Sequence, residues 1–157
     1  MTNVGEGPVI ALSNSPGSAQ AAKKPVATAI DGTATLNGVS ANPNLAGTKL
    51  VVSITGNRDA TDVLKLLPAG VTELHQKGKK LLVGKTLIGT VSGGKTKIPD
   101  LTITFTSAAT KELVQQTLKK VSFLTKNAGT GPRTIQMQLT NLGGQNSNKA
   151  TRQITVQ

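Results

Sequence analysis

The chain of 157 residues has no cysteine, tryptophan or tyrosine, and it has only two phenylalanines. Without cysteine it forms no disulfide bond and no thiolate metal site. The core must therefore be built from Leu, Val, Ile and Ala, and aromatic platforms for stacking single-stranded nucleic acid are missing. The sequence has no run of about 18 apolar residues, so it predicts no membrane-spanning helix and no membrane insertion.

Acidic residues are also scarce, since 7 Asp and Glu stand against 18 Lys and Arg and give a formal net charge of +11. Such a surplus raises the expectation of binding to polyanions such as nucleic acid or acidic glycans. Only three of the basic residues are Arg, which is the side chain that bidentate recognition of phosphates and bases prefers. We favour the other interpretation, in which lysines solubilise strand faces and protect sheet edges.

What the chain does contain is β-branched residues in short alternating runs, separated by Gly, Asn and Pro. This pattern is typical of a β-sandwich. The run over 101–105 is predicted to be a half-buried antiparallel strand, and the runs over 133–140 and 150–156 to be alternating strands. In the run over 86–91 we expect Ile88 and Val91 on opposite faces. The predicted strands cover 8–13, 25–30, 33–36, 49–55, 63–67, 71–74, 80–83, 86–91, 101–105, 121–125, 133–140 and 150–156.

One short helix is predicted between the strands over 101–105 and 121–125. Ser107 or Thr110 can cap its first free N–H groups. An apolar stripe that includes Val114 and Leu118 faces the core, and two late lysines suit the negative end of the helix. A hairpin turn over 75–79 and a turn at Gly93–Gly94 complete this half of the chain.

For the domain organisation, we expect residues 1–7 to be a flexible N-terminal end and 8–157 to be a single domain. Within it, the small and turn-rich segment 13–24 is predicted to be a loop or a linker-like stretch. The N-terminus has neither the basic region nor the long apolar core of a signal peptide. We favour a mature domain or an excised fragment over a cytosolic protein.

The order of these segments resembles the cadherin-like, immunoglobulin-like repeats that occur in tandem in large secreted or surface-attached bacterial proteins. The motifs, in chain order, are PVIALS, PVATAIDGTATLNGVSANPNLAGTKLVVSITGN, DVLKL, KTLIGTVSGG, LTITFTSAATKELVQQTLKKVSF and PRTIQMQLTNLGGQNSNKATRQITV. The resemblance covers almost the whole chain, and each motif alone is weak. It implies an all-β, immunoglobulin/cadherin-like antiparallel β-sandwich with one short helix crossing between strands. It also implies an extracellular or cell-surface location.

The resemblance further implies calcium near the ends of the module in members that keep acidic loops. The matching loops here, 37–40 and 141–145, contain no carboxylate. Calcium needs six to eight oxygen ligands, and only Asp59 and Asp62 lie close together. Turn and capping roles explain these two better, so they are weak calcium candidates and no cofactor is predicted.

No catalytic residue is predicted. His75 is the only histidine, and neither adjacent residue, Leu74 or Gln76, is acidic, so a surface loop position is expected. The run GTVSGGKT (89–96) satisfies the bare spacing of a phosphate-binding loop, but a strand rather than a helix should follow it.

The densest basic group is the set of polyanion-contact candidates Lys77, Lys79, Lys80, Lys85, Lys95 and Lys97. If the two hairpins over 71–83 and 86–105 are neighbours, these lysines share one end of the sandwich. The leading hypothesis is a non-catalytic structural or adhesive repeat module of an extracellular or surface-layer protein, with neighbouring repeats or other copies as partners. The alternative is a polyanion-binding domain that contacts cell-surface polymers or nucleic acid through these lysines.

Overall fold

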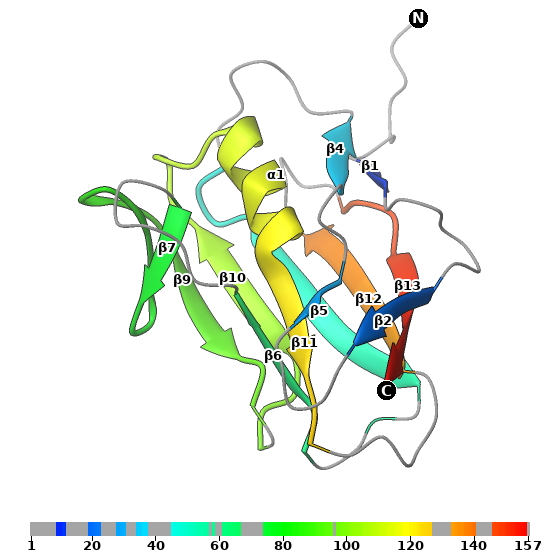
Figure 1. Cartoon of the computed structure of the whole chain (residues 1–157). Coiled ribbons are helices and arrows are strands. Elements are labelled where there is room, and N and C mark those ends of the chain that lie inside the picture. Colours follow the sequence, from blue (N-terminus) through cyan, green and yellow to red (C-terminus); the bar gives the residue numbers. More distant parts are fainter. Residues whose placement is uncertain are drawn as a thin grey trace, which may run out of the picture.

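The computed structural model describes residues 9–11, 19–22, 28–30, 34–37, 45–56, 58, 61–66, 74–95, 97–126, 133–140 and 146–156. The expected flexible end over 1–7 and the calcium candidate Asp59 lie outside these residues. In the described part the chain is β-rich and sandwich-like, with one short helix (Figure 1). The predicted all-β fold class is thereby confirmed.

An eight-stranded sheet forms the larger layer. Its strand order is β2-β13-β12-β5-β10-β9-β8-β7, and β7 to β10 follow one another along the chain as an antiparallel meander. The strands of this sheet are β2 (Ala19–Ala22), β5 (Lys49–Gly56), β7 (Leu74–Lys77), β8 (Lys80–Val83), β9 (Thr86–Gly93), β10 (Leu101–Phe105), β12 (Arg133–Thr140) and β13 (Ala150–Val156).

The second layer is smaller and mixed. A three-stranded sheet has the order β3-β11-β6, and a two-stranded ribbon pairs β1 with β4. Helix α1 (Lys111–Lys120) leads directly into β11 (Val121–Leu124), and both lie over the larger sheet (Figure 1). The other strands of this layer are β1 (Val9–Ala11), β3 (Thr28–Ala29), β4 (Thr35–Asn37) and β6 (Val63–Leu66).

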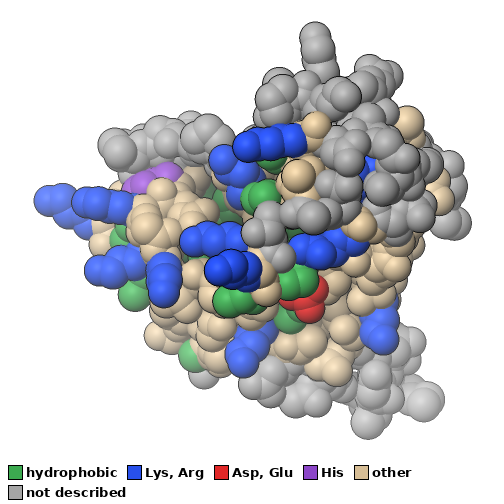
Figure 2. All heavy atoms as spheres, turned by 90° about the horizontal axis from the view of Figure 1, so that it is seen from below, with side chains coloured by type: hydrophobic (Ala, Val, Ile, Leu, Met, Phe, Trp, Pro, Cys, Tyr) green, Lys and Arg blue, Asp and Glu red, His purple; other side chains and the backbone are tan. Residues whose placement is uncertain are grey.

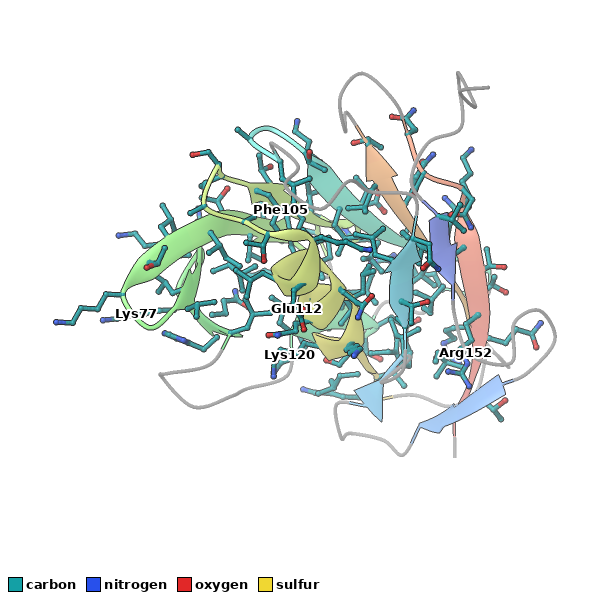
Figure 3. All side chains as sticks on the ribbon, turned by 90° about the horizontal axis from the view of Figure 1, so that it is seen from above. Lys77, Phe105, Glu112, Lys120 and Arg152 are labelled. Carbon is teal, nitrogen blue, oxygen red and sulfur yellow. The ribbon has the colours of Figure 1, made fainter. Side chains whose placement is uncertain are left out.

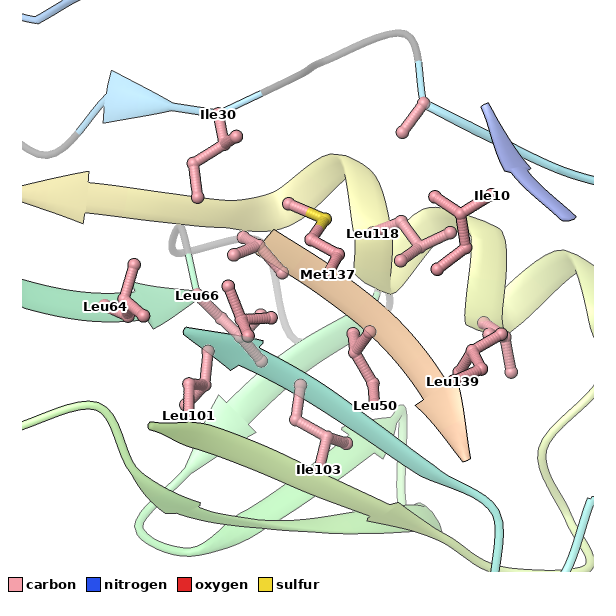
Figure 4. Close-up of a cluster of buried hydrophobic side chains, with 14 of the residues drawn as sticks. Ile10, Ile30, Leu50, Leu64, Leu66, Leu101, Ile103, Leu118, Met137 and Leu139 are labelled. Carbon is pink, nitrogen blue, oxygen red and sulfur yellow. The ribbon is translucent and has the colours of Figure 1, made fainter. Parts of the chain in front are cut away.

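The core lies between these layers and consists almost wholly of aliphatic side chains. Alternation places every second residue of β10 and β12 in it, with Ile103 and Met137 fully buried. Leu64 and Leu66 of β6 and Leu118 of α1 close it from the other side (Figure 4). The buried apolar residues of the described segments form one cluster.

Helix α1 begins where the sequence predicts. The Thr110 hydroxyl accepts a hydrogen bond from the backbone N–H of Leu113 at 3.1 Å, so Thr110 rather than Ser107 is the cap. Val114 and Leu118 are buried as expected, and Lys119 and Lys120 stand in the last turn. The helix ends at Lys120 because Val121 adopts extended backbone angles and starts β11.

Two expected loops contain strands. The segment 13–24 was expected to be a loop, yet β2 lies within it and pairs in parallel with β13. Strand β7 covers His75 and the two residues after it, so the hairpin turn spans only Gly78 and Lys79 and not 75–79. In both places backbone pairing with a neighbouring strand determines the structure, and local side-chain preference does not.

The predicted alternation is wrong near the start of β9. Ile88 and Val91 were expected on opposite faces, but both are buried and Leu87 is exposed. The register between β8 and β9 shifts at this point, which leaves Ile88 as the extra residue of a β-bulge. Thr106 supports the bulge, because its N–H and hydroxyl donate to the carbonyls of Ile88 and Leu87, each at 2.9 Å.

Candidate binding surface

The three connections of the β7–β10 meander share a Gly-Lys dipeptide. Lys79 follows Gly78, Lys85 follows Gly84, and Lys95 follows Gly94. These glycines have φ angles of 62°, 60° and 77°. The first two stand at the first position of two-residue hairpin turns, where the favoured turn types need positive φ. In each connection the glycine supplies the positive φ angle, and the lysine that follows it is exposed at the surface.

All six predicted contact lysines are exposed, and the meander brings five of them to one end. Lys77, Lys79 and Lys80 surround the β7–β8 turn, while Lys95 and Lys97 lie in the connection between β9 and β10. The N–H of Val91 donates to the Lys79 carbonyl at 2.8 Å and ties that turn to β9. In Figure 3, Lys77 projects from the tip of the hairpin, away from helix α1.

Lys85 differs from the other five because it lies in the β8–β9 turn, at the opposite end of strand β8. The expectation that all six share one end is therefore wrong for this residue. Lys85 still contributes to the same surface, since it lines a hollow together with Lys77, Lys79 and Lys80. The separation follows from the antiparallel meander, in which successive turns alternate between the two ends of the strands.

Two hollows adjoin the β7–β8 turn. The larger has a volume of about 650 Å³ and runs along the outer side of the hairpin. Its lining includes His75, Leu82 and the lysines Lys77, Lys79, Lys80 and Lys85. The smaller, of about 210 Å³, lies between the turn and the β9–β10 connection and is lined by Lys79, Lys95, Ser92 and Ile98 among others. Both are large enough to receive charged groups of a ligand beside lysine ammonium groups.

The lysines face one another without a carboxylate at the paired positions. Lys77 and Lys80 are directly opposite each other in the β7–β8 register, where like charges destabilise the pairing. The face of the molecule seen in Figure 2 carries many Lys and Arg side chains and scarcely any acidic ones. An anion bound between the lysines would relieve this repulsion, so the surface is suited to negatively charged ligands.

Asp62, one of the two weak calcium candidates, has a different partner. Both of its carboxylate oxygens accept hydrogen bonds from Arg133, at 3.0 Å from Nε and 3.2 Å from Nη2, and both side chains are fully buried. Arg133 also lies 5.9 Å from the centre of the Phe123 ring. The residues described contain no group of three or more His, Asp or Glu that could hold a metal ion.

The sequence contained a signal for this ion pair. Arg133 occupies the position in RTIQMQLT that alternation assigns to the buried face, two residues before Ile135. A charged side chain at an inward position needs a buried partner of opposite charge. Asp62 fulfils that need and holds the start of β6 against β12, so its role is structural. His75 lies in strand β7, half-exposed, and borders the larger hollow.

The phosphate-loop spacing over 89–96 is explained by the hairpin. Gly89 is inside β9, Gly94 follows its end, and strand β10 comes next in the chain where a phosphate site would need a helix.

Comparison with protein-family models, with curated proteins and with solved structures found no match to this chain. The resemblance to cadherin-like repeats therefore stays a prediction. Among the described residues, no helix has the length and apolar character needed to cross a membrane.

Proposed function

We propose that this protein is a non-catalytic adhesive module that holds an anionic polymer against the lysine-rich meander. The observation that carries the proposal is the convergence of five lysines at one end of β7–β10, next to two hollows. Long-range attraction between this surface and a polyanion is favourable, and each contact releases counterions. The remaining layers supply a firm support, since their aliphatic core is continuous.

The mechanism is electrostatic and involves no covalent step. Lysine ammonium groups are compact, mobile point charges, so they adapt to carboxylate, sulfate or phosphate groups without demanding one geometry. Strand β7 lies at one of the two edges of the larger sheet and carries His75 and Lys77. Among the described residues no further strand pairs with β7, so a ligand bound along it would also protect this edge.

The proposal is tested by replacing Lys77, Lys79, Lys80 and Lys95 with Gln and measuring affinity for heparin by calorimetry. A matched control replaces four lysines outside the meander, Lys65, Lys119, Lys126 and Lys149, which removes the same amount of charge. We expect the first variant to lose most of its affinity and the control to keep most of it. Equal losses would mean that net charge alone, and not this surface, is responsible.

The second candidate function is a structural repeat in a large extracellular or surface-layer bacterial protein, which contacts neighbouring repeats or other copies. The observation in its favour is the sandwich-like fold with a helix between strands, the architecture that the resemblance implies. The two functions are compatible, because a repeat that spaces a surface protein can also adhere to surface polymers. Sedimentation velocity of a protein with two copies of the chain in tandem tests this second function. If copies bind one another, the sedimentation coefficient should rise with protein concentration.

A further inference from the structure

The Gly78–Lys79 turn stands between the two hollows. Both residues line the larger hollow, together with Lys77 and Lys80, and both line the smaller one, together with Lys95. Gly78 and Lys79 are thus shared by the two hollows, and Lys79 is the charged residue of the pair. A ligand long enough to reach from one hollow to the other must pass over this turn and meet lysines on both sides of it.

The turn is held in place, and its carbonyl groups are occupied. The Gln76 side-chain amide donates to the Gly78 carbonyl at 2.8 Å, and the Val91 N–H donates to the Lys79 carbonyl at 2.8 Å. These carbonyl oxygens are acceptors and would disfavour an approaching anion if they faced it alone. Their engagement within the protein leaves the lysine charges as the dominant feature and reduces the ordering cost of binding.

The surface offers few groups that nucleic-acid bases would need for specific recognition. Both phenylalanines of the chain are buried, Phe105 in β10 and Phe123 in β11, so neither ring can stack on a base, and the half-exposed imidazole of His75 is the one ring that borders the larger hollow. Two of the three arginines, Arg133 and Arg152, are buried as well, so bidentate contacts to base edges would depend on Arg58 alone. The exposed cations of the described part are almost all lysines.

A second copy of the chain is also a poor occupant. Each copy carries a formal net charge of +11, so two lysine surfaces would repel one another. Of the seven acidic residues, Asp62 is buried and paired with Arg133, which leaves few carboxylates to meet the lysines of a partner copy.

We infer that the polymer bound here is a single, flexible acidic polysaccharide strand, which crosses the Gly78–Lys79 turn and places acidic groups in both hollows. The larger hollow, at about 650 Å³, is open to solvent and has room for a small molecular unit, and Leu82 gives it an apolar side for the C–H face of a sugar ring. This inference rests on the proposed function and adds the class of polymer and its path.

The test uses the full chain, size-defined heparin fragments and oligothymidylate of equal formal charge at about 150 mM salt. We expect the heparin fragment to bind more tightly by about tenfold, which corresponds to about 1.4 kcal/mol, because a sugar ring can pack on Leu82 in the larger hollow while the buried phenylalanines offer no platform to the bases. A short fragment reaches only the larger hollow and a long fragment reaches both. Lys95→Gln should therefore weaken the long fragment and leave the short one unchanged, whereas Lys80→Gln should weaken both.

Several outcomes would overturn the inference. Equal or tighter binding of oligothymidylate or of duplex DNA would exclude a polysaccharide preference, even if the lysine surface binds polyanions as proposed. Equal effects of Lys95→Gln on short and long fragments would exclude the path across the turn. Failure of every polyanion to bind would overturn the proposed function together with the inference. Far-UV circular dichroism of each variant confirms that these surface substitutions leave the fold intact.

Discussion

Gly94 joins the two layers of the fold, and replacing it with alanine is the most informative change to the scaffold. Its carbonyl accepts the backbone N–H of Leu64 in β6 at 2.9 Å, and its N–H donates to the Asp100 carbonyl at 3.0 Å. Its φ angle is 77°, a value that side-chain-bearing residues rarely adopt. A Cβ atom built on Gly94 would also overlap the Leu64 carbonyl oxygen, which belongs to the backbone and cannot rotate away.

The magnitude follows from these contacts. Left-handed backbone costs an L-residue about 1–2 kcal/mol, and each hydrogen bond that the clash disrupts contributes about 0.5–1.5 kcal/mol. Together these give a loss of about 2–5 kcal/mol for Gly94→Ala, against a total stability of about 5–15 kcal/mol for a domain. Gly78→Ala is the matched control, because its φ is 62° and no heavy atom lies within 4 Å of an added Cβ. Gly78→Ala should lower the free energy of unfolding only by the cost of the left-handed backbone conformation, about 1–2 kcal/mol.

Urea unfolding followed by far-UV circular dichroism measures both variants. The chain has no Trp or Tyr, so intrinsic fluorescence offers little signal. With a urea dependence of about 1–3 kcal/mol per molar, the two unfolding midpoints should differ by roughly 1 M. Coincident midpoints would refute the reasoning, because Gly94 would then have no contact with β6 that Gly78 lacks.

Three further predictions concern the core, the helix and calcium. Asp62→Asn and Arg133→Met should each lower the free energy of unfolding by about 3–5 kcal/mol. The double variant should lose less free energy of unfolding than the sum of the two single losses. Strict additivity in urea titrations would show that the pair is not coupled. Thr110→Ala should cost about 1 kcal/mol because the helix loses its cap, whereas Ser107→Ala should stay within about 0.5 kcal/mol, and reversed sizes would contradict the capping assignment. Millimolar calcium should leave the thermal midpoint unchanged because Arg133 occupies the Asp62 carboxylate, and a clear rise would reveal a site elsewhere.

The regular strands could be predicted because their burial alternates cleanly. Strand β10 (Leu101–Phe105), β12 (Arg133–Thr140) and β13 (Ala150–Val156) have the predicted bounds, and the cap of helix α1 is one of the two residues expected. In these segments the side-chain pattern, the local propensity and the final packing all favour the same structure. The exposure of the six lysines predicted as contacts could likewise be anticipated from sequence, because lysine side chains are rarely buried.

The remaining features depend on contacts between distant parts of the chain. Strand β2 has a weak sequence pattern and forms through pairing with β13. The bulge at Ile88 depends on a register shift against β8 and on hydrogen bonds from Thr106, about which local alternation carries no information. The position of Lys85 at the other end of the meander follows from the antiparallel pairing of β8 with β7 and β9, and the partner of Arg133 lies 71 residues away in the chain.

The salt dependence of polyanion binding tests the central claim most directly. The logarithm of the affinity for heparin is measured against the logarithm of salt concentration for the unmodified chain, the Lys77/Lys79/Lys80/Lys95→Gln variant and the Lys65/Lys119/Lys126/Lys149→Gln control. If the meander is the contact surface, the slope should fall by about 3 in the first variant, at about 0.7–0.9 per lost contact, and stay unchanged in the control. The same slope for all three proteins would contradict the account.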